Sequence, residues 1–282
     1  GYAVLNGALL MKKAVGASRL IFCLENNKKA VLDHLRSLAG GFEYEMDFCL
    51  LPTKYPQGGE RQLIQTVTKK QLPAGKLPAA VGVIISNVHT ARAVADMVFA
   101  DRPSISRVIT VTGLVKNPSN FLVPIGTDLG ELVQQAGGVT ERKNRVIVGG
   151  PMTGVCIGEN MGAKTITRKG NDTVTKVSGG LLILEPLHKK ETPCIRCGAC
   201  ATVCPARLVP YKIDFAIRRE DVDTCQALHA TECIACGCCS YICPAKRELS
   251  YYTAQARDSV RAKLREEAKK RGSADKSSSE TK

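Results

Sequence analysis

Two cysteine runs in the carboxyl-terminal half constrain the fold more than any other feature of this sequence. Each run has the spacing C-x2-C-x2-C-x3-C followed by proline, and the second run repeats the first. Three thiolates spaced in this way wrap a loop around three irons of a cubane cluster, and the fourth cysteine reaches across to the other cluster. The runs therefore predict two [4Fe–4S] clusters with crossed ligation. The two predicted ligand sets are Cys194, Cys197, Cys200 and Cys243, and Cys233, Cys236, Cys239 and Cys204.

Structural zinc is the main alternative for these thiols. Zinc sites usually combine two C-x2–4-C pairs separated by a longer arm, whereas both runs are triplets followed by Cys-Pro. A basic, zinc-containing structural or nucleic-acid-binding module stays open as an alternative function. Cys238 does not fit the triplet spacing, so we expect a small buried residue and not a ligand. The same core position is expected of the isolated cysteines Cys23, Cys49, Cys156 and Cys225.

Composition narrows the class of protein further. Thirteen cysteines in 282 residues do not indicate a disulfide framework, because such frameworks belong to much shorter secreted chains. The mean hydropathy of −0.06 and the lack of an apolar run near 18 residues predict a globular, cytosolic protein without a membrane span. The net charge of +14 suits an anionic partner, but only 5% of residues are aromatic and Trp is absent. We therefore expect no nucleic-acid binding.

Residues 1–105 alternate between helical and strand patterns. Buried strands are predicted at 19–24 and 79–86, and helices at 28–39 and 90–99, from their apolar spacing and from glycines that follow the first helix. Alternation of this kind favours a sheet covered by helices, which is an α/β domain.

In residues 106–156 the spacing of apolar residues changes, and it predicts a compact α+β unit. Strand patterns stand at its beginning and near its end, with one short helix between them. Asp128 and Glu131 form a capping pair at the start of this helix, and Gly137 and Gly138 end it.

Three segments follow along the chain. Residues 157–189 predict short strands, 190–250 contain the cysteine runs, and 251–282 predict a basic helix with a disordered tail from Gly272. The helix carries a stripe of basic residues. The simple interpretation of this stripe is a solvated helix face, and the alternative is docking to an anionic lipid surface or an acidic electron carrier. The stripe consists of Arg257, Arg261, Arg265 and Lys269.

A second candidate site is the sequence KYPQGGE at residues 54–60, just before a helix predicted at 62–68. Two adjacent glycines let a ligand approach the backbone closely, and the start of a helix favours an anion. An ordinary loop remains the alternative, because no GxGxxG fingerprint is present.

Four motifs together make the chain resemble the C subunit of the Rnf electron-transport complexes, a family of ion-translocating ferredoxin:NAD+ oxidoreductases. They are KYPQGGE at 54–60, GLVKNP at 113–118, GGPMTG at 149–154 and the two cysteine runs. The resemblance extends to about Tyr252. It implies a partial Rossmann-like flavin domain over 1–105, shared with the NADH-oxidising subunit of respiratory complex I. It also implies an SLBB-like β-grasp domain over 106–156, a bacterial-type 2[4Fe–4S] ferredoxin domain and a helical carboxyl-terminal tail.

The resemblance also implies an oxidoreductase function. In the family, FMN exchanges hydride with NAD(H) and single electrons with the two clusters. Gly58, Gly59 and Glu60 would lie near the flavin or the nicotinamide, and Asn87 matches a flavin-contacting turn. The family's glycine-rich flavin loop would precede residue 1, so we expect an incomplete amino-terminal domain and FMN binding that needs upstream residues.

The same resemblance predicts the partners and the location. Expected partners are the other Rnf subunits, including integral membrane ones, and ferredoxin or another iron–sulfur protein. We expect a peripheral position on the cytoplasmic face of the cell membrane. A similar layout occurs in the cobalamin reductase of propanediol-utilisation microcompartments, which would deliver electrons to a corrinoid. That reductase is the second interpretation.

Overall fold

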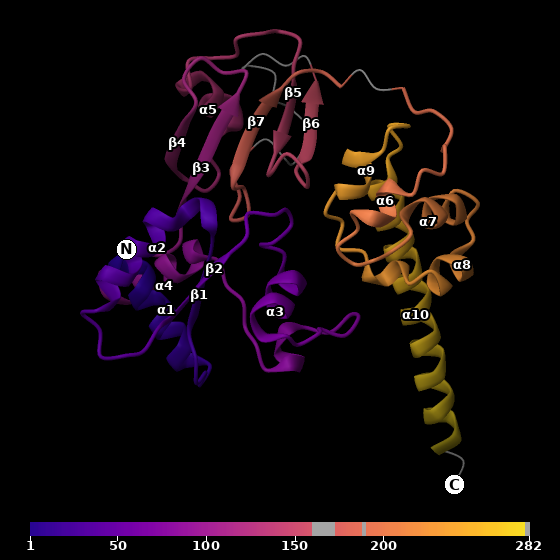
Figure 1. Ribbon diagram of the computed structural model, residues 1–282, viewed down its shortest axis with the longest axis horizontal. Helices are drawn as coiled ribbons and strands as arrows, with labels where there is room; N and C mark the ends of the chain where they lie inside the picture. Colours follow the sequence, from indigo (N-terminus) through magenta and orange to yellow (C-terminus); the bar gives the residue numbers. More distant parts are fainter. Residues whose placement is uncertain (160–172, 188–189, 280–282) are drawn as a thin grey trace. The chain divides into compact units, whose positions relative to one another are not determined.

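The computed structural model describes residues 1–159, 173–187 and 190–279 (Figure 1). The chain divides into two compact units, residues 1–105 and 106–282. Residues 160–172, which belong to the expected short-strand segment, lie outside the described part. Among the described helices, none is both long enough and apolar enough to cross a bilayer.

The first unit is a small α/β layer built on two parallel strands. Strand β1 (Ile21–Glu25) pairs with β2 (Asp47–Leu51), and Phe22 stacks on Phe48 across the pair. Its core joins these strands to helices that carry the apolar stripes. The helical elements are α1 (Tyr2–Ala14), η1 (Asn26–Lys28), α2 (Lys29–Ala39), α3 (Glu60–Thr68), η2 (Pro78–Val81) and α4 (Val88–Ala100).

The strand expected at 79–86 is not formed. Residues 78–81 make the 3-10 turn η2, and the chain then runs to Asn87 without joining a ladder. The apolar run is present, but no described neighbouring strand accepts its backbone hydrogen bonds. Ile84 is consequently 59% exposed.

The second unit begins with a five-stranded sheet of order β4-β3-β7-β5-β6, shown with α5 against it in Figure 1. β3 and β7 run parallel, and the other neighbours run antiparallel. The apolar side of α5 packs on the sheet and closes a core that includes Ile109, Leu132 and Ile183. The elements are β3 (Ser106–Gly113), β4 (Ser119–Pro124), α5 (Leu129–Gln135), β5 (Arg145–Val148), β6 (Val155–Glu159) and β7 (Gly180–Leu184).

Both predicted ends of helix α5 are confirmed. The Glu131 amide donates to Asp128 Oδ1 at 3.0 Å, which satisfies one of the free N–H groups of the first turn. Gly137 and Gly138 follow the helix with φ of +83° and +82°, a backbone region in which a side chain would be strained.

The cysteine region is a set of short helices packed on one long helix. Helix α10 contacts α7, α8, α9 and η4. It continues through Gly272 to Ser279, where the sequence predicts a disordered tail, because one glycine reduces helix stability by only about 1 kcal/mol. The elements are α6 (Ala199–Thr202), α7 (Pro210–Ile217), α8 (Val222–Ala227), η4 (Ala230–Glu232), α9 (Cys238–Ile242) and α10 (Leu249–Ser279).

Candidate metal centres

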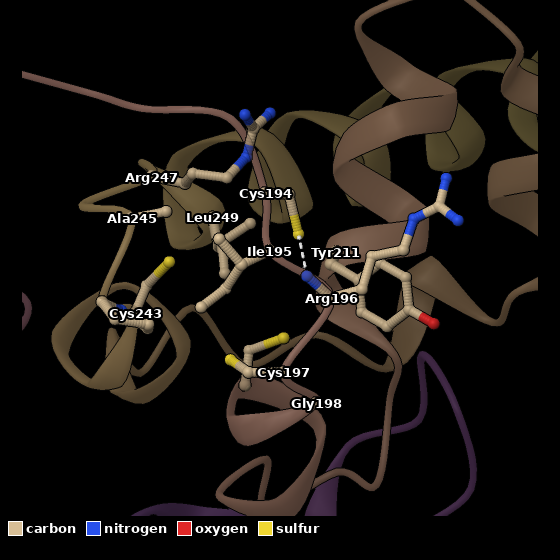
Figure 2. Close-up of a pocket in the computed structure, with 12 residues that line it drawn as sticks. Cys194, Ile195, Arg196, Cys197, Gly198, Tyr211, Cys243, Ala245, Arg247 and Leu249 are labelled. Carbon is tan, nitrogen blue, oxygen red and sulfur yellow. Dashed lines mark hydrogen bonds between the residues drawn. The ribbon is translucent and has the colours of Figure 1, made fainter.

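The two cysteine runs enclose two hollows. The first has a volume of about 330 Å³, including its open mouth, and Figure 2 shows the side chains around it. Its thiols come from both runs. Cys194, Cys197 and Cys200 belong to the first run, and Cys243 ends the second.

The second hollow, of about 350 Å³, has the reciprocal composition. Three of its thiols are the triplet of the second run, and the fourth is the last cysteine of the first run. The structure therefore brings together both predicted ligand sets, each around its own hollow. The thiols at the second hollow are Cys204, Cys233, Cys236, Cys239 and the additional Cys238.

The arrangement of the thiols bears on the kind of metal group that they could hold. Within the described residues, no three His, Cys, Asp or Glu side chains converge closely enough to hold one metal ion. A structural zinc requires four ligands at about 2.0–2.3 Å from one point. A cubane instead separates its thiolates, because each binds a different iron. Thiols of both runs around each hollow fit a cluster held by crossed ligation.

Backbone geometry explains why each loop can surround a cluster. Gly198 and Gly237 have φ of +76° and +83° and precede the short helices α6 and α9. Arg196 and Ala235, two positions earlier, are also left-handed, with φ of +54° and +53°. The amides of Arg196, Ala235 and Leu208 each lie 3.4 Å from a sulfur, those of Cys194, Cys233 and Cys204 respectively. Such donors stabilise thiolate charge.

Burial controls the protonation of the thiols that face these hollows. Loss of hydration raises the pKa of Cys239 to about 12 and that of Cys236 to about 11, with neighbouring thiols adding to both shifts. Burial also raises the pKa of Cys200 and Cys204. A coordinated thiol is deprotonated by its metal, so these positions suit sulfurs whose charge is compensated by iron.

A buried ion-pair network lies beside the first hollow. Asp214 is fully buried, and its two carboxylate oxygens accept from Arg218 Nε at 2.8 Å and from Arg247 Nη2 at 2.5 Å. Glu191 completes the network by pairing with both arginines. Figure 2 shows the Arg247 guanidinium directed away from the labelled sulfurs. The aliphatic part of Arg247 therefore lines the first hollow, while its charged group pairs with Asp214 and Glu191.

The remaining cysteines occupy varied environments. Cys225 is fully buried in the core of the cysteine region, as expected. Cys23 and Cys49 are half-buried and face each other across the β1–β2 pair. Cys156 is exposed on the edge strand β6, so its expected core position is wrong. Cys238 is half-buried at the second hollow.

The basic stripe of α10 divides into two halves. Arg257 donates to the Cys233 carbonyl at 3.2 Å, and Arg261 donates to the Thr231 carbonyl at 3.3 Å. These two arginines hold the helix against the start of the second cysteine run. Arg265 and Lys269 are exposed. The stripe is therefore partly structural.

The flavin candidates lie at the starts of two helices. Gly59 caps α3, and Glu60 is the first residue of that helix. The space around Gly58 is open, whereas a Cβ on Gly59 would lie 2.7 Å from Gln62 Oε1. That Gln62 oxygen is buried without a partner among the described residues. The turn thus combines an approachable backbone with an unused acceptor, which fits a ligand with hydrogen-bond donors.

Asn87 caps helix α4. Its Oδ1 accepts the His89 amide at 2.9 Å, and its side-chain NH2 is a donor that can serve a ligand.

Comparisons with known families agree with this order of domains. Residues 2–96 match the Nuo51 FMN-binding domain, 108–155 match the SLBB domain, and 187–244 match the 4Fe-4S dicluster domain. The expected fold class, with flavin-type, β-grasp and ferredoxin-type domains followed by a helix, is confirmed.

Sequence relatives cover most of this chain. The chain is 33% identical to the C subunit of an ion-translocating oxidoreductase complex of Rhodobacter capsulatus, over 78% of this chain and 41% of that one. These C subunits are homologues of the chain over most of its length. The chain is 36% identical to the C subunit of the Na(+)-translocating ferredoxin:NAD(+) oxidoreductase complex of Acetobacterium woodii, over 81% of this chain and 50% of that one. The chain thus spans half or less of these relatives.

Solved structures reproduce the same fold at lower identity. An NAD+-reducing [NiFe]-hydrogenase in the H2-reduced state matches 92% of this chain and 52% of its own, with a TM-score of 0.57 and 18% identity. The air-oxidised form gives a TM-score of 0.54 over 79% of this chain and 43% of its own. The fold of this chain is therefore shared with a hydrogenase chain.

Sequence reasoning missed several residues around the hollows. Thr253 lines the second hollow from α10, and Tyr211 lines the first from α7. A signal for the ion-pair network was available, because Asp214 is the single acid in the apolar helix α7. The partner of this acid, Arg247, comes from a loop beyond the second run, which the sequence did not indicate.

Proposed function

We propose that this chain transfers electrons between NAD(H), FMN and two [4Fe–4S] clusters, as the peripheral C subunit of an ion-translocating ferredoxin:NAD+ oxidoreductase complex. The observation that supports this most is the crossed composition of the hollows, because each combines one triplet with the last cysteine of the other run. When bound, a [4Fe–4S] cluster accepts and releases one electron at a time.

The eight cysteines are the proposed iron ligands. Cys194, Cys197, Cys200 and Cys243 hold one cluster, and Cys204, Cys233, Cys236 and Cys239 hold the other. Residues of both runs line both hollows, so the sites are adjacent, as electron transfer from one to the other requires. Cys238 also borders the second hollow, and the triplet spacing assigns ligation to Cys239 instead.

The flavin and nicotinamide positions belong to the first unit. Gly58, Gly59 and Glu60 are proposed to lie against the flavin or the nicotinamide, with Gln62 Oε1 accepting one hydrogen bond from the ligand. The Asn87 amide nitrogen would donate another.

The proposed partners are the other members of the complex, including integral membrane ones, together with ferredoxin or a similar iron–sulfur protein. We place the chain on the cytoplasmic face of the membrane, where NAD(H) is available. The exposed half of the α10 stripe supplies positive charge suited to an anionic surface or an acidic carrier.

The test uses the chain purified without oxygen. Iron and sulfide are assayed first, and the iron–sulfur absorbance is then followed after addition of NADH. We expect two clusters per chain and rapid bleaching. Clusters that are reduced by dithionite but not by NADH would refute the nicotinamide part of the proposal. A preparation that binds zinc and no iron would refute the whole of it.

A matched pair of variants tests the ligand assignment. Cys239→Ala is expected to lose one cluster, whereas Cys238→Ala is expected to retain both, because only Cys239 completes the triplet. Equal loss of iron from both variants would contradict the assignment.

A further inference from the structure

The internal repeat continues beyond the cysteines and shows how the two hollows differ. The register that aligns Cys204 with Cys243 also aligns Leu208 with Arg247. It likewise aligns Tyr211 with Ser250 and Asp214 with Thr253. All of these except Asp214 line one hollow or the other. The hollows therefore share a backbone plan but present different side chains to their sulfurs.

One backbone hydrogen bond to a sulfur is matched between the two sites, whereas the Leu208 amide bond to Cys204 Sγ has no counterpart at Cys243 among the described residues. The Arg196 amide lies 3.4 Å from Cys194 Sγ, drawn as a dashed line in Figure 2, and the equivalent Ala235 amide lies 3.4 Å from Cys233 Sγ. These equivalent bonds cannot make the two clusters differ.

A side-chain hydroxyl beside Cys233 is a further difference between the two sites. Thr253 Oγ1 lies 3.5 Å from Cys233 Sγ, and Thr253 is only 1% exposed. Its counterpart Asp214 is engaged with two arginines instead. In Figure 2 the Tyr211 hydroxyl points away from the labelled sulfurs of the first hollow. In the described part of the chain, Cys194 receives no side-chain donor.

The hydroxyl hydrogen has two possible acceptors. Thr253 Oγ1 also lies 3.2 Å from the Ser250 carbonyl, to which it donates while a Cys233 thiol donates to Oγ1. A thiolate bound to iron has no proton and can only accept. The Thr253 hydrogen is then the donor available to that sulfur, and burial keeps water from competing.

We propose that Thr253 is a positioning residue that raises the reduction potential of the cluster in the second hollow by donating its hydroxyl hydrogen to the Cys233 thiolate. A reduced cluster carries one more negative charge than the oxidised cluster, so a donor to its sulfur stabilises the reduced form more. This inference rests on the cluster assignment of the proposed function. It adds that one hydroxyl contributes to the difference between the two sites.

The experiment is a redox titration followed by EPR on the full chain, reconstituted without oxygen. Thr253→Val removes the hydroxyl at nearly constant shape, and Thr253→Ser retains it. At a fixed potential we expect Thr253→Val to lower the reduced-to-oxidised ratio of one cluster by roughly two- to tenfold, the worth of one hydrogen bond, and to leave the other unchanged. The serine variant should restore the wild-type ratio.

Thr202→Val is the matched control. Thr202 lies in α6 next to the first triplet, but its hydroxyl bonds to the Gly198 carbonyl and not to a sulfur. We expect both potentials to stay at their wild-type values in this variant.

Several outcomes would overturn the inference. It fails if Thr253→Val binds full iron at wild-type potentials, or if serine shifts the potential as much as valine does. Thr253→Ala is the second variant without a hydroxyl, and failure of both variants to bind iron would assign Thr253 to assembly instead. Absence of iron from the wild-type chain would refute the cluster assignment itself, which separates the two failures.

Discussion

The β-grasp region and the cysteine region of the second unit are stabilised in different ways. The β-grasp sheet and α5 enclose a continuous apolar core that includes Ile109, Leu132 and Ile183, all fully buried. The cysteine region has two smaller apolar clusters, two thiol-lined hollows and a buried ion-pair network. The comparison indicates that the β-grasp region can fold by burial alone, whereas the cysteine region depends on what fills its hollows.

Removal of iron is expected to have the largest effect on this difference. Metal binding free energy acts as folding free energy where the ligand site does not exist in the unfolded chain. Amide hydrogen exchange of the iron-free chain should therefore show lost protection across residues 190–250 and retained protection across 106–156. Equal protection of the two regions with and without iron would contradict the inference that only the cysteine region depends on iron.

Asp214→Ala should be the next largest perturbation. It leaves Arg247, a residue that is only 8% exposed, without its closest partner, and breaking a buried pair destabilises by about 3–5 kcal/mol. Denaturant unfolding of the iron-loaded chain would measure this loss. Asp258→Ala is the control, since its exposed pair with Arg257 contributes at most about 1 kcal/mol. Similar losses in both variants would argue against a structural role for the network.

Leu132→Ala tests the β-grasp region in the same way. Truncation of a fully buried leucine destabilises by about 2–5 kcal/mol through lost burial and the cavity that remains. We expect this loss in the unfolding of the β-grasp region, with iron content unchanged. A parallel loss of iron would show that the two regions fold as one cooperative body.

The smallest expected effect is that of Asp128→Ala. The substitution removes the cap on the Glu131 amide and should destabilise helix α5 by about 1 kcal/mol. A shift of the melting temperature would measure it, and Asp128→Asn, which keeps an acceptor, should stay close to wild type. Equal melting temperatures for the two variants would show that the Asp128 cap does not stabilise this region.

Most of the correct predictions rest on the spacing of residues that are close together in the chain. The capping pair, the double glycine after α5 and both triplets depend on residues near one another in the chain, and the structure forms each turn as expected. The strand expected at 79–86 is a failure of the same reasoning. An apolar run matches the pattern of a strand, but a strand also requires an adjacent strand for its backbone hydrogen bonds. The residues of the run do not show whether such a strand is present.

By itself, the sequence determined the chemistry of the sites, because the number and spacing of the thiols specify two cubane clusters and not a disulfide or a single ion. Only the tertiary structure decided which polar groups surround them. Asp214 and Arg247 meet across segments distant in the chain, and Thr253 reaches Cys233 from another helix. Such contacts depend on how helices pack against each other, and packing depends on the whole buried surface instead of on any local pattern.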